Sequence, residues 1–127
     1  MIDALFHGEN YQLARQLLDA AVLRHQGIAS NIANAETPGY KRVDLAPDFT
    51  TQLAAAMNGD EPGSRSPAPR LMEDTTATSA RPDGNNVQME KELMLLARNN
   101  TEHSFLSQVV SYNLRSLRVA ISGKSSG

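Results

Sequence analysis

The sequence predicts a mainly α-helical protein in which two long helices, one near each end of the chain, pack as a coiled-coil-like pair around an irregular middle. Two observations predict this fold class. Apolar residues recur at intervals of three and four over residues 10–35 and again over residues 86–121, the spacing of one face of a helix. Between them, residues 41–82 are interrupted too often by proline, glycine and aspartate to form a long element. We therefore expect three parts, with residues 1–40 and 83–127 together forming one α-helical domain and the middle partly disordered.

The first long helix is expected to begin near Asn10 as N-cap, because Gly8 interrupts any earlier helix, and to end near Ala35 because Pro38 disfavours helical geometry just before it. Gly27 is costly inside a helix but permits close approach of a neighbouring backbone. Seven of eight positions in a heptad frame are apolar: Tyr11, Ala14, Leu18, Ala21, His25, Ile28, Ile32 and Ala35.

The middle segment offers only short elements. Residues 48–57 include a run of leucine and alanine that favours a short helix. Residues 59–70 have the composition of a linker, and residues 73–80, rich in threonine and small residues, favour a short strand. We expect this segment to stay disordered until it meets a partner.

The second long helix is expected to begin at Asn86, with Asn85 or Asn86 as its cap, and to end before Gly123. Seven of ten positions in its heptad frame are apolar: Met89, Leu93, Leu96, Asn100, His103, Ser107, Val110, Leu114, Leu117 and Ile121. Further apolar residues lie off this frame: Leu95, Phe105, Leu106, Val109 and Tyr112. Each leucine or phenylalanine left in water forgoes about 1.5–3 kcal/mol. A stripe wider than one partner helix covers therefore predicts association with other molecules.

The composition excludes several classes of function. A chain of 127 residues allows one domain with a modest core, and a formal net charge of −2 does not suit a nucleic acid or an acidic membrane surface. The absence of cysteine excludes disulfides, thiol catalysis and cysteine-containing zinc sites. No apolar run is long enough to insert into a membrane, and Met1–His7 lacks the features of a cleaved signal peptide.

Two blocks near opposite ends of the chain carry a family resemblance. The run from Ala29 to Tyr40 resembles the N-terminal signature of the flagellar basal-body rod and hook family, the axial proteins that stack into the bacterial flagellar rod. The run from Asp83 to Glu92 is similar to the opening of that family's C-terminal helix, and the short chain resembles its proximal-rod members. The resemblance covers residues 9–44 and 81–123.

This resemblance implies a structural subunit of the proximal rod that transmits torque within a hollow helical shaft, with no chemistry and no cofactor. Its implied partners are copies of itself, other proximal-rod proteins and the junction proteins at the membrane ring or export gate. Its implied location is the periplasmic rod of the basal body, reached by export through the flagellum's own channel without a cleaved signal peptide.

The predicted subunit interface combines the signature turn with apolar residues of both helices: Leu18, Ile28, Asn31, Ile32, Asn34, Thr37, Pro38, Gly39, Tyr40, Leu93, Leu96, Val110, Leu114, Leu117 and Ile121. For Asn31 and Asn34, helix capping and turn hydrogen bonds are an equal alternative. For the turn from Thr37 to Tyr40, the alternative is a role in chain reversal alone.

No catalytic, cofactor or metal site, and no small-molecule substrate, is predicted. His25 and His103 interrupt apolar seams, but no two histidines lie one or two helical turns apart, so we expect structural packing and no zinc site. An enzyme would need a pocket that so small a core does not easily enclose. The rival function is a soluble helical adaptor or export chaperone that binds one partner through an exposed amphipathic helix.

Overall fold

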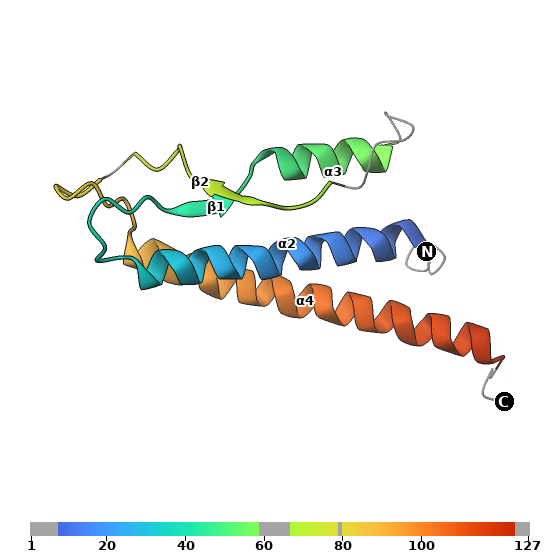
Figure 1. The fold of residues 1–127 in the computed structure, drawn as a ribbon. Coiled ribbons are helices and arrows are strands. Elements are labelled where there is room, and N and C mark those ends of the chain that lie inside the picture. The colour runs from blue at the N-terminus through green and yellow to red at the C-terminus, as the bar shows by residue number, and fades with distance from the viewer. Residues whose placement is uncertain (1–7, 59–66, 79, 124–127) are drawn as a thin grey trace.

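The computed structural model describes residues 8–58, 67–78 and 80–123. In these ranges the order of elements is α2 (Gly8–Ala33), β1 (Val43–Leu45), α3 (Asp48–Asn58), β2 (Leu71–Glu73) and α4 (Met89–Ser122). The two long helices lie side by side and antiparallel, as predicted (Figure 1). No helix among these elements is long and apolar enough to cross a membrane.

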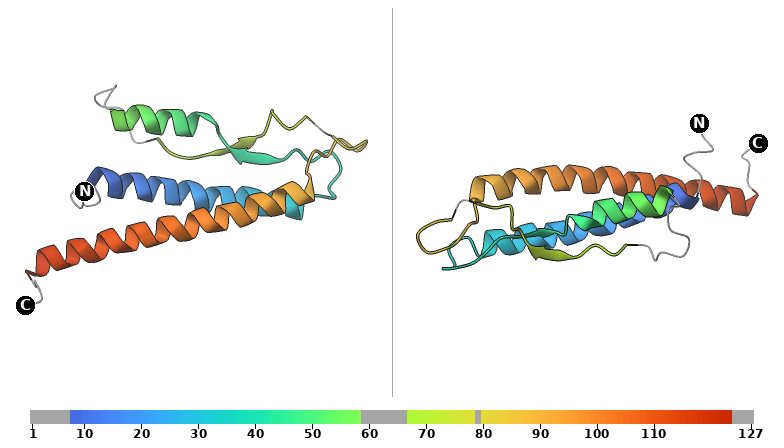
Figure 2. Two further views of the ribbon diagram at one scale, coloured as in Figure 1. Left: turned by 180° about the vertical axis from the view of Figure 1, so that it is seen from behind. Right: turned by 90° about the horizontal axis from the view of Figure 1, so that it is seen from above.

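Helix α2 is the centre of the fold. Figure 2 shows it between α4 on one side and a second layer, formed by the two-stranded sheet β1–β2 and by α3, on the other. Its heptad positions Ala14, Ala21 and Ile28 are buried, and α4 reaches this side of the helix, since Asn99 donates to the Ala21 carbonyl. On the other side, Ala20 packs with Phe49 and Leu53 in a small buried apolar cluster. The partly buried side chains of Leu13, Leu17 and Leu45 pack against this cluster.

The middle segment is more ordered than expected. Strands β1 and β2 pair antiparallel, with Asp44 opposite Met72, and α3 confirms the predicted short helix. The strand expected over residues 73–80 instead ends at Glu73, because the next carboxylate, Asp74, accepts hydrogen bonds from the backbone and side chain of Thr76 and so forms a turn. Of the expected linker, residues 59–66 lie outside the described residues.

Gly27 performs the predicted role of allowing close approach, but its neighbour is a side chain and not a backbone. A Cβ atom at this position would lie 3.0 Å from Cδ2 of Leu71 in β2 and 3.7 Å from Cγ2 of Val43 in β1. The glycine therefore lets the two-stranded sheet pack closely on α2.

The helix boundaries differ from the predicted ones in three places. Helix α2 begins at Gly8, so this glycine does not interrupt it. It ends at Ala33, with the chain continuing in a tighter turn in which the Ala35 amide donates to the Ile32 carbonyl. Helix α4 begins at Met89 with Gln88 as N-cap, because the two asparagines expected to cap it bind elsewhere. Its end before Gly123, which has a φ of 64°, is as predicted.

The heptad frame predicted for α4 is wrong by about one residue. The buried positions are Glu92, Asn99 and Asn113, whereas Leu93 and Leu114 of the predicted frame are exposed. Polar residues therefore occupy the seam that faces α2, and an apolar pattern alone could not locate it.

Candidate functional site: a polar clasp and an uncovered helix face

The loop that follows α2 and the loop that precedes α4 meet at the same end of the helix pair (Figure 1). The Gly39 amide donates to the Asp83 carbonyl at 2.9 Å, and the Arg81 side chain donates to the carbonyl of Ala35. Five buried polar side chains join these segments, and we call them the polar clasp: Asn31, Arg42, Asn85, Asn86 and Glu92. The two sequence blocks that carry the family resemblance thus meet in three dimensions.

Asn85 closes the C-terminal end of α2. Its side-chain nitrogen donates to the carbonyls of Asn34, Ala35 and Thr37 at 2.9–3.1 Å. These carbonyls belong to the turn that follows Ala33, and each also accepts a second hydrogen bond, from Thr37, Arg81 and Tyr40 respectively. Its side-chain oxygen accepts from the Val87 amide at 2.8 Å. One asparagine therefore ends the first helix and shapes the approach to the second.

Asn86 binds the backbone of the residue that precedes strand β1. Its side-chain oxygen accepts from the backbone amide of Arg42 at 2.7 Å. Both asparagines are thus engaged with the first half of the chain, which is why neither caps α4.

Asn31 couples α2 to the first strand. Its amide group mimics a strand neighbour, since it donates to the Val43 carbonyl at 2.9 Å and accepts from the Val43 amide at 2.8 Å. It also donates to Oε2 of Glu92 at 3.2 Å and accepts from the Tyr40 hydroxyl at 3.1 Å. The tyrosine expected as an interface anchor therefore binds within its own chain through its hydroxyl group.

An ion pair lies at the centre of the polar clasp. Nε of Arg42 donates to Oε1 of Glu92 at 2.7 Å, and the side chains of the two residues are 3% and 0% exposed. Nη1 of Arg42 pairs with Asp74, and Asp44 lies 3.4 Å from this same Nη1 atom. Burying these charges costs free energy, so the ion pair stabilises the fold only when every partner is present.

Burial and the neighbouring carboxylates act in opposite directions on Arg42. Desolvation alone would lower the pKa of its guanidinium, but the hydrogen bond and charge of Glu92, together with Asp74 and Asp44, raise it above the ordinary value. For Asp74, partial desolvation is outweighed by hydrogen bonds from Thr76 and Arg42, which lower the pKa of its carboxyl group below 3.8.

The lowered pKa of Asp74 predicts a pH-dependent contribution to stability. The unfolded chain binds the extra proton first as pH falls, so this contribution is complete above the unfolded value of 3.8 and is lost as pH falls through the lower folded value. The free energy of unfolding in urea should therefore drop between about pH 7 and about pH 3, and Asp74→Asn should reduce this drop. The exposed control Asp19→Asn should leave it as in the wild type. An unchanged drop in the Asp74 variant would contradict the assignment.

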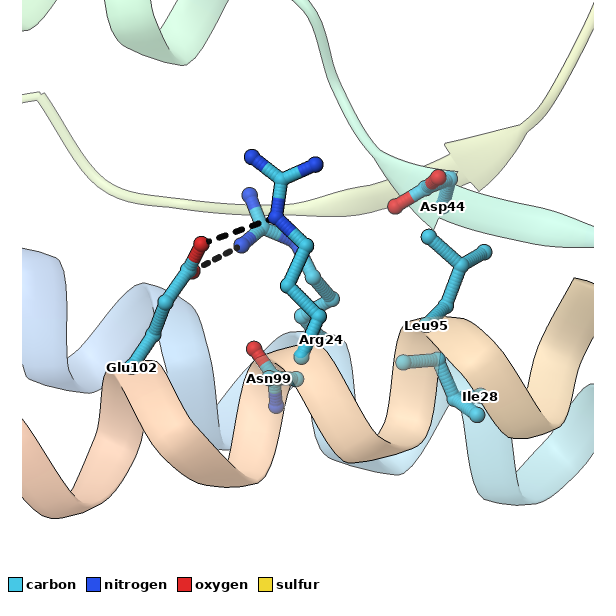
Figure 3. A pocket seen from close by; sticks show the side chains of 7 residues that line it. Arg24, Ile28, Asp44, Leu95, Asn99 and Glu102 are labelled. Atoms are coloured by element: carbon cyan, nitrogen blue, oxygen red, sulfur yellow. Dashed lines mark hydrogen bonds and ion pairs between the residues drawn. The ribbon is translucent and has the colours of Figure 1, made fainter.

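A cavity of about 170 Å³ lies beside the polar clasp, between α2, α4 and β1 (Figure 3). At its edge, Glu102 accepts from Arg24 at 3.3 Å and from Arg98 at 3.2 Å. Asn99 donates to the Ala21 carbonyl at 2.8 Å, while its buried side-chain oxygen has no hydrogen-bond partner among the described residues. Such a polar cavity has room for water molecules that would satisfy this oxygen.

The structure brings His25 and His103 to one shallow hollow of about 250 Å³, although they lie far apart in the sequence. Both are exposed, so the expected packing of these histidines within the apolar seam is wrong. Among the described residues, no group of three or more histidine, aspartate or glutamate side chains is arranged to hold a metal ion.

The C-terminal half of α4 carries large apolar side chains that are exposed. With 34 residues against the 26 of α2, α4 is about 12 Å longer at 1.5 Å per residue. We call its exposed apolar residues the uncovered face: Phe105, Tyr112, Leu114, Leu117, Val119 and Ile121. Leu117 is 56% exposed and Ile121 is 79% exposed, and Phe105, Val109 and Tyr112 border a hollow of about 480 Å³. So many large apolar side chains in water indicate a surface that another molecule covers.

The residues predicted from the sequence to form an interface fall into three groups. Ile28 and Asn31 are buried inside the chain and have structural roles there. Thr37, Pro38 and Gly39 form an exposed turn, and Leu93, Leu114, Leu117 and Ile121 are also exposed. The remaining residues are partly buried: Leu18, Ile32, Asn34, Tyr40, Leu96 and Val110.

Sequence reasoning assigned no clasp role to Arg42, Asn85, Asn86 or Glu92. The last three lie in the second resemblance block, where they were interpreted only as helix-start residues. A detectable signal was the spacing of Glu92, Asn99 and Asn113 by seven and fourteen residues, which places polar residues on one face of α4 at the heptad period.

Comparison with known proteins identifies relatives of this chain. A family model described as "Flagella basal body rod protein" matches residues 28–41, the segment around the signature turn. The chain is 34% identical over 114 residues to the flagellar basal body rod protein FlgB of Cereibacter sphaeroides, which covers 80% of this chain and 84% of that protein. It is 29% identical to the FlgB proteins of Borrelia hermsii, over 86% of this chain and 93% of that protein, and Aquifex aeolicus, over 94% and 97%.

Proposed function

The chain belongs to the FlgB family of flagellar basal body rod proteins, and we propose that it joins the rod by burying the uncovered face of α4 against neighbouring subunits. It is a structural subunit of the bacterial flagellar basal body rod and not an enzyme. The rival function of an adaptor or export chaperone is not favoured, because the relatives reported above are rod proteins.

The observation that carries the proposal is the exposed apolar surface at the end of α4. Its six residues are exposed and lie between residues 105 and 121 of α4, the helix that Figure 1 shows extending past the N-terminal end of α2. Burying each such side chain contributes about 1.5–3 kcal/mol, so several together supply a stable contact even after the entropy lost on association is subtracted.

The polar clasp has a supporting role in this proposal. It fixes the end of α2 to the start of α4, so that the two helices leave the same point and the uncovered face projects at the opposite end (Figure 1). The exposed turn of Thr37, Pro38 and Gly39 then forms a second contact surface at the clasp end. The partly buried members of the predicted interface are proposed to contact neighbouring subunits at the sides of the helix pair: Leu18, Ile32, Asn34, Tyr40, Leu96 and Val110.

The finer partners and location also belong to this proposal. We assign as neighbours copies of the chain, other proximal-rod proteins, and the junction proteins at the membrane ring or export gate. The assembled product is a hollow helical shaft that crosses the periplasm and transmits torque, and the subunit reaches it by export without a cleaved signal peptide. The support is the relationship to the rod proteins named above. A head-to-tail contact between the two exposed surfaces that does not close into a ring would build an open helical filament.

The triple substitution Leu114→Ser, Leu117→Ser and Ile121→Ser tests the interface. Since these side chains are exposed, the folded chain should lose less than about 1 kcal/mol of unfolding free energy, whereas incorporation into basal bodies and swimming motility should be lost. The matched control Glu90→Ser, Lys91→Ser and Met94→Ser changes three exposed residues in the other half of α4 and should incorporate. Normal incorporation of the first variant would overturn the proposal.

A further inference from the structure

We propose that the neighbour covering the uncovered face is an acidic amphipathic helix from a different rod protein, and not the same face of a second copy. This inference rests on the proposed function, because it specifies the chemistry of the partner at the same surface. It is carried by the distribution of charge along α4.

Charge is strongly one-sided in the second half of α4. All 14 aspartates and glutamates of the chain lie at or before Glu102. Within residues 103–123, the formal charges are those of Arg115 and Arg118, and neither arginine forms an ion pair with another described residue. The negative end of the helix dipole offsets part of this charge but amounts to only about half an elementary charge. The surface around the apolar residues is therefore positive.

The two arginines are placed to contact a helix that covers the apolar residues. Arg115 follows Tyr112 by three positions, and Arg118 follows Leu114 by four, which are the spacings of neighbours on a helix surface. Arg115 also borders the hollow that Phe105 and Tyr112 line. An apolar stripe flanked by charge of one sign is the pattern with which helices select partners of the opposite sign.

The same face of a second copy does not supply the opposite charge. Two uncovered faces in contact would bring four arginines together without a carboxylate on either segment, and like charges across an interface disfavour association. Helix α2 is no better a partner, because Asp19 is its only carboxylate after Glu9 and lies between Arg15 and Arg24. Since neither of these two surfaces of a second copy pairs the arginines with carboxylates, we assign the positive face to a different protein, whose helix combines apolar residues with carboxylates.

Synthetic helices of defined charge test the inference with the full-length chain. Two fluorescent peptides would carry leucine at heptad positions a and d, with glutamate in one and lysine in the other at positions e and g. The chain should bind the glutamate peptide about tenfold more tightly, the effect of two surface charge pairs. In the variant Arg115→Glu with Arg118→Glu the preference should reverse, whereas the matched control Arg15→Glu with Arg98→Glu should keep the wild-type preference.

Two outcomes would overturn the inference. One is equal binding of both peptides, or a preference that the substitution of Arg115 and Arg118 leaves unchanged. The other is sedimentation showing that the wild-type chain dimerises and that the Leu114, Leu117 and Ile121 serine variant does not, which would assign the face to a second copy.

Basal-body incorporation separates the two proposals. If that serine variant incorporates normally, the proposed interface fails. If it does not, while the arginine-to-glutamate variant does, only the acidic partner is wrong.

Discussion

Replacing Glu92 by glutamine is expected to lower the free energy of unfolding by about 3 kcal/mol, at the lower end of the range for breaking a buried ion pair. The substitution leaves Arg42, whose side chain is 3% exposed, without its most deeply buried partner. Asp74 continues to pair with the guanidinium, which is why the loss should not reach the upper end. Urea denaturation followed by circular dichroism measures the change.

The exposed neighbour Glu90 provides the matched control for Glu92. Glu90→Gln removes the same charge from the same helix and should change the free energy of unfolding by less than about 0.5 kcal/mol. Adding Arg42→Met to Glu92→Gln should recover part of the loss, because removing both members of a buried ion pair costs less than leaving one unpaired. Equal effects at the two glutamates would show that the ion pair does not stabilise the fold.

Replacing Asn85 by alanine is expected to lower the free energy of unfolding by about 1–3 kcal/mol, because the buried Val87 amide is left without an acceptor and three carbonyls each lose one of their donors. The carbonyls of Asn34, Ala35 and Thr37 would lose their shared donor, and the Val87 amide would lose its acceptor. Amide hydrogen exchange should show the last turn of α2 opening far more often than its middle.

Asn100 is the control for Asn85, since it is an exposed asparagine on α4. Asn100→Ala should be close to neutral in denaturation. Asn85→Asp should be nearly as harmful as the alanine variant, because a carboxylate keeps the acceptor for Val87 but cannot donate to the three carbonyls. A stable aspartate variant would show that the cap on α2 matters little.

The seam of the first helix could be predicted from the sequence because it follows a simple physical rule. Ala14, Ala21 and Ile28 recur every seven residues and are buried, as an apolar stripe against another helix requires. The stop near Pro38 and the turn at Gly39, whose φ is 75°, were equally readable, because each depends on the local geometry of proline or glycine.

The seam of α4 could not be located in the same way. Its inward positions include Glu92 and Asn99, and a search for apolar residues therefore selected the neighbouring stripe that contains Leu93. Whether a polar residue belongs in a seam depends on its partners, here Arg42 and the Ala21 carbonyl, which come from distant parts of the chain. The surplus of apolar residues in the second half of α4 was nevertheless predicted correctly, because it depends on composition and helix length alone.

The polar clasp was beyond sequence reasoning for a related reason. Asn85 and Asn86 precede a helix and are good N-caps by local propensity. Hydrogen bonds with distant parts of the chain outweigh this preference. Asn85 binds the Ala35 carbonyl after the end of α2, and Asn86 binds the Arg42 amide. The strand boundary at Glu73 is a similar case, since it depends on pairing with β1 as well as on the turn at Asp74.

The central claim is that the end of α4 is exposed in the free subunit and covered in the rod. The chain contains no cysteine, so the variant Leu117→Cys offers a single thiol for maleimide labelling in the purified chain and in isolated basal bodies. The thiol should react rapidly in the purified chain, should resist labelling in intact basal bodies, and should react again after their denaturation. Equal, rapid labelling of the purified chain and of intact basal bodies would contradict the claim, because the face would then stay in water within the finished rod.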